Sequence, residues 1–131
     1  MTFTDKMLEV KKQLEKHGHT ALVSDFALAY AGKSLAEIDK LTIHDKLHKD
    51  ALTEFYDKIK QSDAILVLNY DKRGIKNYIG GNTLMEIGFA HVLNKKIFLL
   101  NPVPEIEYYK SEIEATKPII LNGNLKQINL N

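Results

Sequence analysis

The sequence predicts a single α/β domain that is built around a parallel β-sheet. Candidate helices and strands alternate along the chain, which is the pattern of a parallel sheet whose strands are connected by helices. The segment Ala64–Leu68 is a continuous apolar run, as expected for a strand that is buried on both faces. With 131 residues, of which 44% are hydrophobic, the chain suits one core, so residues 1–131 are assigned to a single domain.

The first half of the chain predicts two main helices and a short strand. Residues 4–17 place apolar side chains at helical spacing, and Gly18 ends this helix. Residues 20–23 follow as a short strand candidate. Residues 25–41 are ambiguous but contain a candidate short helix, and residues 44–61 form a long helix with an apolar stripe.

The second half of the chain predicts three strands and two helices in alternation. The strands are expected at residues 64–68, 96–100 and 118–121, and the helices at residues 83–93 and 107–115. The alternation opens on a helix, although the first strand of an open parallel sheet is commonly central. Either the fold begins one element late or a strand is missing from this chain. A missing strand leaves three possibilities: the remaining strands pair across the gap, another chain covers the opening, or Met1 is an internal methionine of a protein that begins upstream.

Composition and charge exclude several functional classes. The chain carries 18 basic and 17 acidic residues, so its net charge of +1 gives no electrostatic basis for binding nucleic acid or a membrane surface. The absence of cysteine excludes disulfides, thiolate metal sites and a thiol nucleophile. No apolar run is long enough to span a membrane and the N-terminal segment lacks a signal-peptide core, so we expect a cytoplasmic protein.

The loop that follows the strand 64–68 is the strongest candidate for a ligand site. In open α/β sheets, ligands bind beyond the carboxyl ends of the strands, and this loop is longer than a usual strand-to-helix connection. Its glycines let backbone N–H groups approach a ligand closely, and the start of the next helix favours an anion. No Gly-Lys-Ser/Thr ends the loop, so it is not a Walker loop. The candidate binding residues are Asn69, Asp71, Tyr78, Gly80, Gly81 and Asn82.

Glu86 is the only carboxylate of the predicted helix 83–93, whose other residues are apolar around most of its circumference. It lies one turn from the predicted helix start, where the helix dipole would stabilise its anion. A carboxylate above the strand ends suits a nucleophile or a group that stabilises a developing oxocarbenium centre. Thr83 and Glu86 also form a capping-box pattern, and Gly80–Gly81 is compatible with a simple turn. The catalytic and the structural interpretations of Glu86 therefore both stay open.

Three segments of the chain share a pattern with one enzyme superfamily. They are SDAILVLN, the glycine-bearing loop and GGNTLMEIGFAHVLNKKIFLLNP, within residues 44–101. The pattern consists of Asp63 before the strand, then Asn82-x-x-x-Glu86-x-Gly88-x-Ala90, then Asn94-Lys95. It resembles the nucleoside 2-deoxyribosyltransferase superfamily, which includes the deoxynucleotide N-glycosidases. The resemblance implies a flavodoxin- or Rossmann-like three-layer sandwich.

The resemblance also implies a chemistry. The substrate is a small molecule with an N-glycosidic bond, either a nucleoside or a nucleotide, and Glu86 is the nucleophile at its anomeric carbon. Under this interpretation, the remaining loop residues hold the substrate. Gly80, Gly81 and Asn82 line the sugar or phosphate side, Asn69 and Asp71 border the cleft, and Tyr78 stacks on the base. No cofactor is implied, because the chemistry needs only a carboxylate, a proton source and a dry pocket.

The chain departs from the superfamily at two positions, which leaves other functions open. Gly80 stands where transferases carry an aspartate, and Phe55 stands where another aspartate is typical. The alternative is a non-catalytic nucleotide-binding module of the same fold, and the third possibility is a purely structural protein. His44 and His48 are spaced like two zinc ligands but lack a third, so no metal is expected.

We expect a homodimer or a higher homo-oligomer. A missing strand would leave unpaired backbone groups beside the strand 64–68, and exposed sheet edges recruit partners. In the superfamily that the chain resembles, a residue near the chain end completes the site of a neighbouring subunit. Asn122 is the candidate for this role here.

Overall fold

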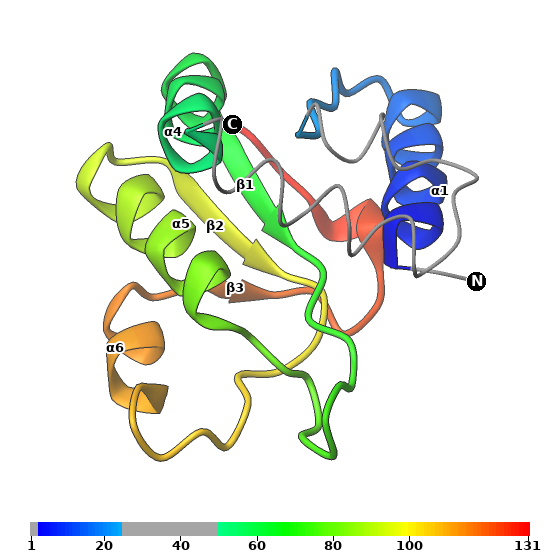
Figure 1. The fold of residues 1–131 in the computed structure, drawn as a ribbon. Helices are drawn as coiled ribbons and strands as arrows, with labels where there is room; N and C mark the ends of the chain where they lie inside the picture. The colour runs from blue at the N-terminus through cyan, green and yellow to red at the C-terminus, as the bar shows by residue number, and fades with distance from the viewer. Residues whose placement is uncertain (1–2, 25–49) are drawn as a thin grey trace. The chain divides into compact units, whose positions relative to one another are not determined.

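The computed structural model describes residues 3–24 and 50–131 of the chain (Figure 1). The chain divides into two units, Met1–Phe55 and Tyr56–Asn131. The short helix predicted within residues 25–41 and the first residues of the helix predicted at 44–61 lie outside the described residues. In the part of the chain that the structure describes, no helix is long and apolar enough to cross a membrane.

The first unit contains helix α1 (Phe3–Lys16), which confirms the first predicted helix. Gly18 ends it with φ 89°, and the main-chain N–H of His19 donates to the carbonyl of Leu14 over 3.1 Å. This is the closure that a glycine in the left-handed region allows at a helix end. Residues 20–23 have no regular secondary structure, so the strand predicted there is wrong. A segment this short becomes a strand only when a neighbour pairs with it.

Helix α4 (Ala51–Gln61) begins in the first unit and ends in the second. Asp50 caps its start, because the main-chain N–H of Thr53 donates to Oδ1 of Asp50 over 2.9 Å. The Thr53 hydroxyl, which donates to Oδ2 of Asp50, and the Thr53 main-chain N–H together hold the pKa of Asp50 below its ordinary value. In the second unit, the ring of Tyr56 on α4 packs edge-on against Phe89, with 5.2 Å between the ring centroids.

The second unit is built around a parallel sheet of three strands among its described residues. The strands lie in the order β1 (Ala64–Val67), β2 (Lys96–Leu99) and β3 (Ile119–Ile120). Helix α5 (Gly81–Val92) connects β1 to β2, and helix α6 (Lys110–Ala115) connects β2 to β3. The one-turn helix η1 (Leu125–Gln127) follows β3. These elements confirm the predicted α/β fold of flavodoxin or Rossmann type with a parallel sheet.

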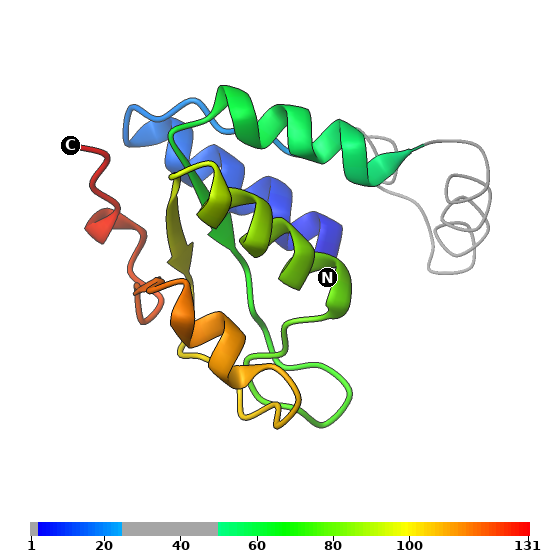
Figure 2. The same cartoon turned by 90° about the vertical axis from the view of Figure 1, so that its left-hand side faces the viewer.

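The connections place the site-bearing helix on one face of the sheet. Both crossovers run in the same direction along the sheet, and right-handed crossovers then put α5 and α6 on the same face. Figure 1 and Figure 2 show the two helices side by side on that face. Because the strands are parallel, their carboxyl ends meet at a single edge of the sheet.

Strand β2 forms the centre of the core, whereas β1 is less buried than its sequence predicts. Ile97, Phe98 and Leu99 of β2 are buried between their two neighbouring strands. In β1 only Val67 is buried, and the other three residues are half-buried. The prediction that the apolar run Ala64–Leu68 is buried on both faces is therefore wrong. Among the described strands β1 has one neighbour, which leaves its outer side less covered.

Candidate functional site

Two asparagines join the carboxyl ends of β1 and β2. The side-chain amide of Asn69 donates to the carbonyls of Asn101 and Pro102 over 2.8 and 3.1 Å. In return, Oδ1 of Asn69 accepts the main-chain N–H of Asn101 over 2.9 Å, and the Asn101 amide donates to the carbonyl of Asn69 over 3.1 Å. Asn69 is fully buried, so its polar atoms are engaged with the scaffold.

This pair includes a residue that the sequence analysis missed. Asn101 is not among the predicted site residues, although both β1 and β2 are followed by the dipeptide Leu-Asn. That repeated dipeptide is the signal by which the pair was detectable. Because parallel strands end at one edge, the same residue type after neighbouring strands can form reciprocal hydrogen bonds.

The loop between β1 and α5 folds back on itself like a hairpin and is held by hydrogen bonds between its own residues. At its base, the main-chain N–H of Tyr78 donates to the carbonyl of Tyr70 over 3.0 Å. Oδ1 of Asp71 accepts the main-chain N–H of Asn77 over 2.9 Å, so this carboxylate organises the loop. At the tip, Arg73 and Gly74 have φ of 55° and 74°, as in the tight turns that close hairpins.

Tyr78 and Gly80 lie together where the loop enters α5. A Cβ added at Gly80 would meet the Tyr78 ring at 3.3 Å, so the absence of a side chain leaves room for this ring. The guanidinium carbon of Arg73 lies 6.0 Å from the centre of the same ring. The hydroxyl of Tyr109 donates to the main-chain oxygen of Ile79, the residue between Tyr78 and Gly80. Tyr109 comes from 30 residues further along the chain, and no local pattern in the sequence predicts this contact.

Helix α5 starts earlier than the sequence predicts, and this excludes the capping role of Glu86. Gly80 is the N-cap and Gly81 is the first helical residue, with no side-chain cap. Thr83 therefore lies inside the helix, and Glu86 lies in its second turn, too far along to bond to the N-cap N–H. The capping-box interpretation is wrong, because it depends on a helix that begins after Thr83.

Glu86 is half-buried, and its carboxyl holds a proton more tightly than an ordinary glutamate does. Burial raises its pKa from the ordinary value of 4.5 to about 7. Its Oε1 accepts a hydrogen bond from the side-chain amide of Asn82 over 3.3 Å, one turn earlier on α5. The expectation that the helix dipole dominates is corrected, because the dipole acts mainly in the first turn and Glu86 lies beyond it.

The outer face of α5 is more exposed than its apolar sequence predicts. Only Ile87 and Ala90 are buried, and they face the sheet. Met85 and Val92 are 46% and 72% exposed, and they lie on one side of the helix with the exposed Gly81 and Gly88. We call Gly81, Met85, Gly88 and Val92 the α5 stripe. The prediction of a helix that is buried on most sides is therefore wrong.

The other predicted site residues lie at the same end of the sheet but are not in one cluster. Gly81 and Asn82 are exposed in the first turn of α5. Asn122 is exposed in the turn after β3, with φ 50°. Within residues 3–24 and 50–131, no three His, Asp or Glu side chains are arranged to hold a metal ion. His44 and His48 lie outside the described residues.

The fold and the loop define a small α/β protein of the flavodoxin or Rossmann type, with polar residues at the carboxyl edge of a three-stranded parallel sheet. A scan against protein-family models, a search of curated proteins and a search of solved structures each gave no match. The assignment to a fold class therefore comes from the architecture of the chain itself.

Proposed function

We propose that the protein cleaves or transfers the N-glycosidic bond of a nucleoside or nucleotide, with Glu86 as the reacting carboxyl. The observation that carries this proposal is the state of Glu86. It is half-buried, it has lost its only evident structural role as a cap, and its pKa is raised to about 7 by burial. Perturbed carboxyls beside a polar loop are typical of catalytic sites.

The proposed reaction proceeds in two steps. In the first, an oxygen of ionised Glu86 bonds to the anomeric carbon, while the electron pair of the C–N bond leaves with the base, which takes up a proton. In the second step, water or another base displaces the carboxylate, which gives hydrolysis or transfer. A pKa near 7 keeps a large ionised fraction of Glu86 at neutral pH, as the first step requires. In the second step Glu86 leaves as a carboxylate, and the attacking water or base loses a proton to solvent, which balances the proton that the departing base took up.

The neighbouring residues take supporting roles in this proposal. The Asn82 amide, 3.3 Å from Oε1 of Glu86, orients the carboxyl and favours its ionised form. Gly81 has open space beside it and lets the substrate approach the start of α5, whereas Gly80 leaves room for the Tyr78 ring, which is proposed to stack on the base. Asp71 acts by ordering the loop. Asn69 acts as a scaffold residue, because its amide is already engaged with the backbone that follows β2.

The proposed partners are the small-molecule substrate and a second copy of the chain. The half-buried β1 edge and the exposed α5 stripe are surfaces that a second copy would cover. In such a dimer, the exposed Asn122 is proposed to complete the site of the neighbouring subunit.

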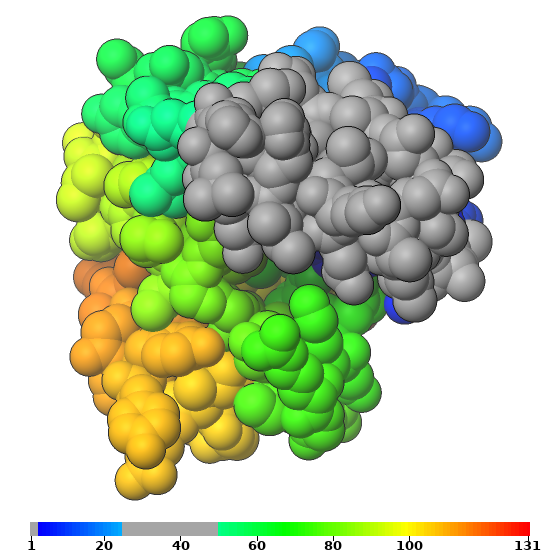
Figure 3. Space-filling model, viewed as in Figure 1, coloured from blue at the N-terminus to red at the C-terminus, as the bar shows by residue number. Residues whose placement is uncertain are grey.

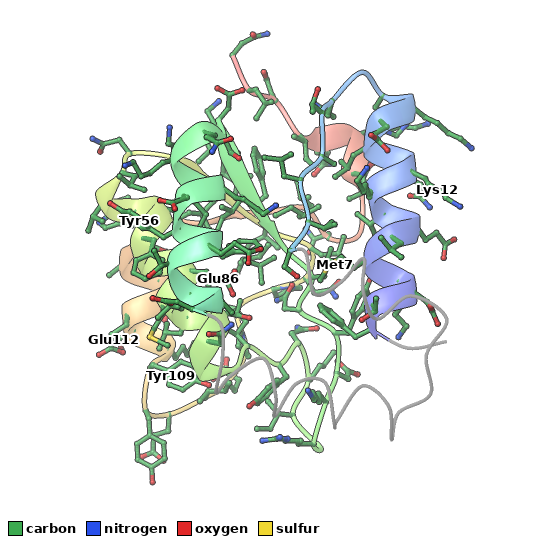
Figure 4. The ribbon with its side chains drawn as sticks, turned by 45° about the horizontal axis from the view of Figure 1, so that its top comes forward. Met7, Lys12, Tyr56, Glu86, Tyr109 and Glu112 are labelled. Atoms are coloured by element: carbon green, nitrogen blue, oxygen red, sulfur yellow. The ribbon has the colours of Figure 1, made fainter. Side chains whose placement is uncertain are left out.

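A screen for release of free base tests the proposal. Deoxynucleosides and their 5′-monophosphates are incubated with the protein, and the products are separated by chromatography. We expect release by the wild type, loss of about 99% of this rate in Glu86→Gln, and an unchanged rate in the matched control Glu112→Gln. Glu112 is an exposed carboxylate on α6 (Figure 4). Equal rates in the wild type and Glu86→Gln would refute the role of Glu86.

A non-catalytic nucleotide-binding module is the second candidate function. It is favoured by Gly80, since the superfamily that the sequence resembles carries an acidic group at this position in its transferases. Calorimetric titration with the same compounds separates the two functions. Nucleotide binding without base release would support the module and would contradict the enzyme.

A further inference from the structure

Two hydrogen-bonded ties join the β1–α5 connection to the β2–α6 connection. The first is the Asn69–Asn101 pair, where both connections begin. The second lies where the first connection ends, and there the Tyr109 hydroxyl donates to the main-chain oxygen of Ile79. Figure 3 shows the side chains of the β1–α5 loop beside those of the segment that leads into α6. Figure 4 labels Tyr109 at the start of α6 and Glu86 on α5.

The second tie acts on the peptide group that enters α5. The oxygen of Ile79 shares a peptide plane with the N–H of Gly80, the N-cap of the helix that carries Glu86. A hydrogen bond to this oxygen therefore fixes the orientation of the backbone at the helix start. Burial, together with the neighbouring Tyr78, raises the pKa of Tyr109, so its hydroxyl keeps its proton and stays a donor at neutral pH.

The same peptide group also determines where Tyr78 lies. Tyr78 directly precedes Ile79, and its ring fits against Gly80 at a distance that leaves no room for a Cβ without adjustment. Ile79 is 1% exposed, so its side chain anchors this part of the loop in the core. A change in the Ile79–Gly80 peptide would therefore move the Tyr78 ring on one side and the first turn of α5 on the other.

Tyr109 presents its hydroxyl from a well-anchored backbone. Pro104 and Ile106 are buried in the β2–α6 connection, and Pro102 further restricts its backbone. The main-chain N–H of Tyr109 donates to the carbonyl of Ile106 over 3.2 Å. The tip of the β1–α5 loop, in contrast, is exposed around Arg73. The hydrogen bond therefore links an exposed surface loop to a segment that is anchored in the core.

We propose that Tyr109 is a positioning residue for the site around Glu86. Through the Ile79–Gly80 peptide, its hydroxyl holds Tyr78 and the first turn of α5 in the arrangement that binds substrate. This inference rests on the proposed function for its catalytic consequence, but its effect on the loop can be measured without any activity. Tyr109 acts on binding rather than on the reacting carboxyl, because Glu86 lies in the second turn of α5.

Site-resolved trypsin cleavage of the native protein tests the effect on the loop. The exposed Lys72, Arg73 and Lys76 are cleavage sites, and mass spectrometry follows each bond with time. We expect Tyr109→Phe to be cleaved at these bonds about fivefold faster than the wild type, because loss of the hydroxyl lets the loop open more often. Tyr108→Phe is the matched control, since Tyr108 is the adjacent tyrosine and is 90% exposed, and its cleavage rate should not change.

A second variant, Gly80→Ala, tests the same part of the loop. Gly80→Ala keeps the hydroxyl but pushes on the Tyr78 ring, so it should also speed cleavage of the loop, which supplies a second variant if Tyr109→Phe does not fold. Equal loop cleavage in Tyr109→Phe and Tyr108→Phe, both shown to be folded by circular dichroism, would overturn the inference. If Tyr109→Phe does not fold, wild-type cleavage rates in Gly80→Ala would overturn it instead.

Steady-state kinetics tests the consequence for the site. With a substrate from the base-release screen, Tyr109→Phe should raise KM about tenfold and leave kcat within about twofold of the wild type. A merely structural role would lower the active fraction and hence kcat, with KM unchanged, and that result would refute the positioning role. If the wild type releases no base, the proposed function fails, whereas faster cleavage in Tyr109→Phe would still support the role of Tyr109 in positioning the loop.

Discussion

Glu86→Gln should remove a pH dependence from the stability of the protein. Burial raises the pKa of Glu86 from 4.5 to about 7 in the folded state. The folded protein therefore holds this proton more tightly than the unfolded chain, and the resulting stability is fully present below about pH 4.5 and is lost as the pH rises through 7. The complete loss is about 3 kcal/mol in the free energy of unfolding, and most of it falls between pH 5 and pH 8.

Urea unfolding at pH 5 and pH 8 measures this effect. Between these pH values, the wild type should lose about 2–3 kcal/mol more stability than Glu86→Gln, because glutamine has the same shape but does not titrate. Glu112→Gln removes an exposed carboxylate, so it should keep the pH dependence of the wild type. Carbon NMR of the side-chain carboxyl gives a direct check, with an expected titration midpoint near pH 7 for Glu86.

One result would refute the reasoning about Glu86. If the stability of Glu86→Gln changed with pH as much as that of the wild type, and the carboxyl signal titrated near its ordinary value, then burial would not perturb this group. The electrostatic argument for a catalytic carboxyl would then fail, independently of any assay for activity.

Three other predictions concern activity, stability and assembly. If Glu86 is an ionised nucleophile, base release should fall about tenfold for each pH unit well below 7, and a rate that rises steadily down to pH 4 would contradict this. Asn69→Ala should lower the free energy of unfolding by about 2–4 kcal/mol in urea titrations, because it leaves buried main-chain groups without partners. Asn131→Ala, at the exposed chain end, should change it by less than about 0.5 kcal/mol. Light scattering should show a homodimer that Val92→Glu converts to a monomer, whereas a stable wild-type monomer at micromolar concentration would refute the dimer.

The sequence by itself determined those helices and strands whose ends depend on residues close to them in the chain. The apolar spacing of α1 and the glycine after it predict that helix, because its hydrogen bonds and its closure act within a few residues. The order of strands and helices from Ala64 onwards likewise predicts the parallel sheet, since parallel neighbours require a crossover. The sequence also located the loop between β1 and α5, because this loop directly follows a strand that the apolar run predicts.

Where a local pattern admitted two structures, the tertiary structure decided between them. Thr83 and Glu86 have the spacing of a capping box, but α5 starts at Gly81, where the loop meets Tyr78 and the Tyr109 hydroxyl. The strand predicted at residues 20–23 is absent for a related reason, because a strand requires a paired neighbour that its own sequence does not supply.

The chemical character of the site residues also depends on contacts that are distant in the chain. The sequence predicts that Asn69 is a polar residue of a ligand-binding loop. In the structure it is fully buried and pairs with Asn101, which lies 32 residues away. The sequence predicts that Glu86 is an anion near the start of a helix, but in the structure burial raises its pKa to about 7. The sequence determined which residue types stand near the carboxyl edge of the sheet. Only the tertiary structure decided which of them are buried and hydrogen-bonded, because desolvation depends on the surrounding atoms of the folded chain and not on neighbouring residues alone.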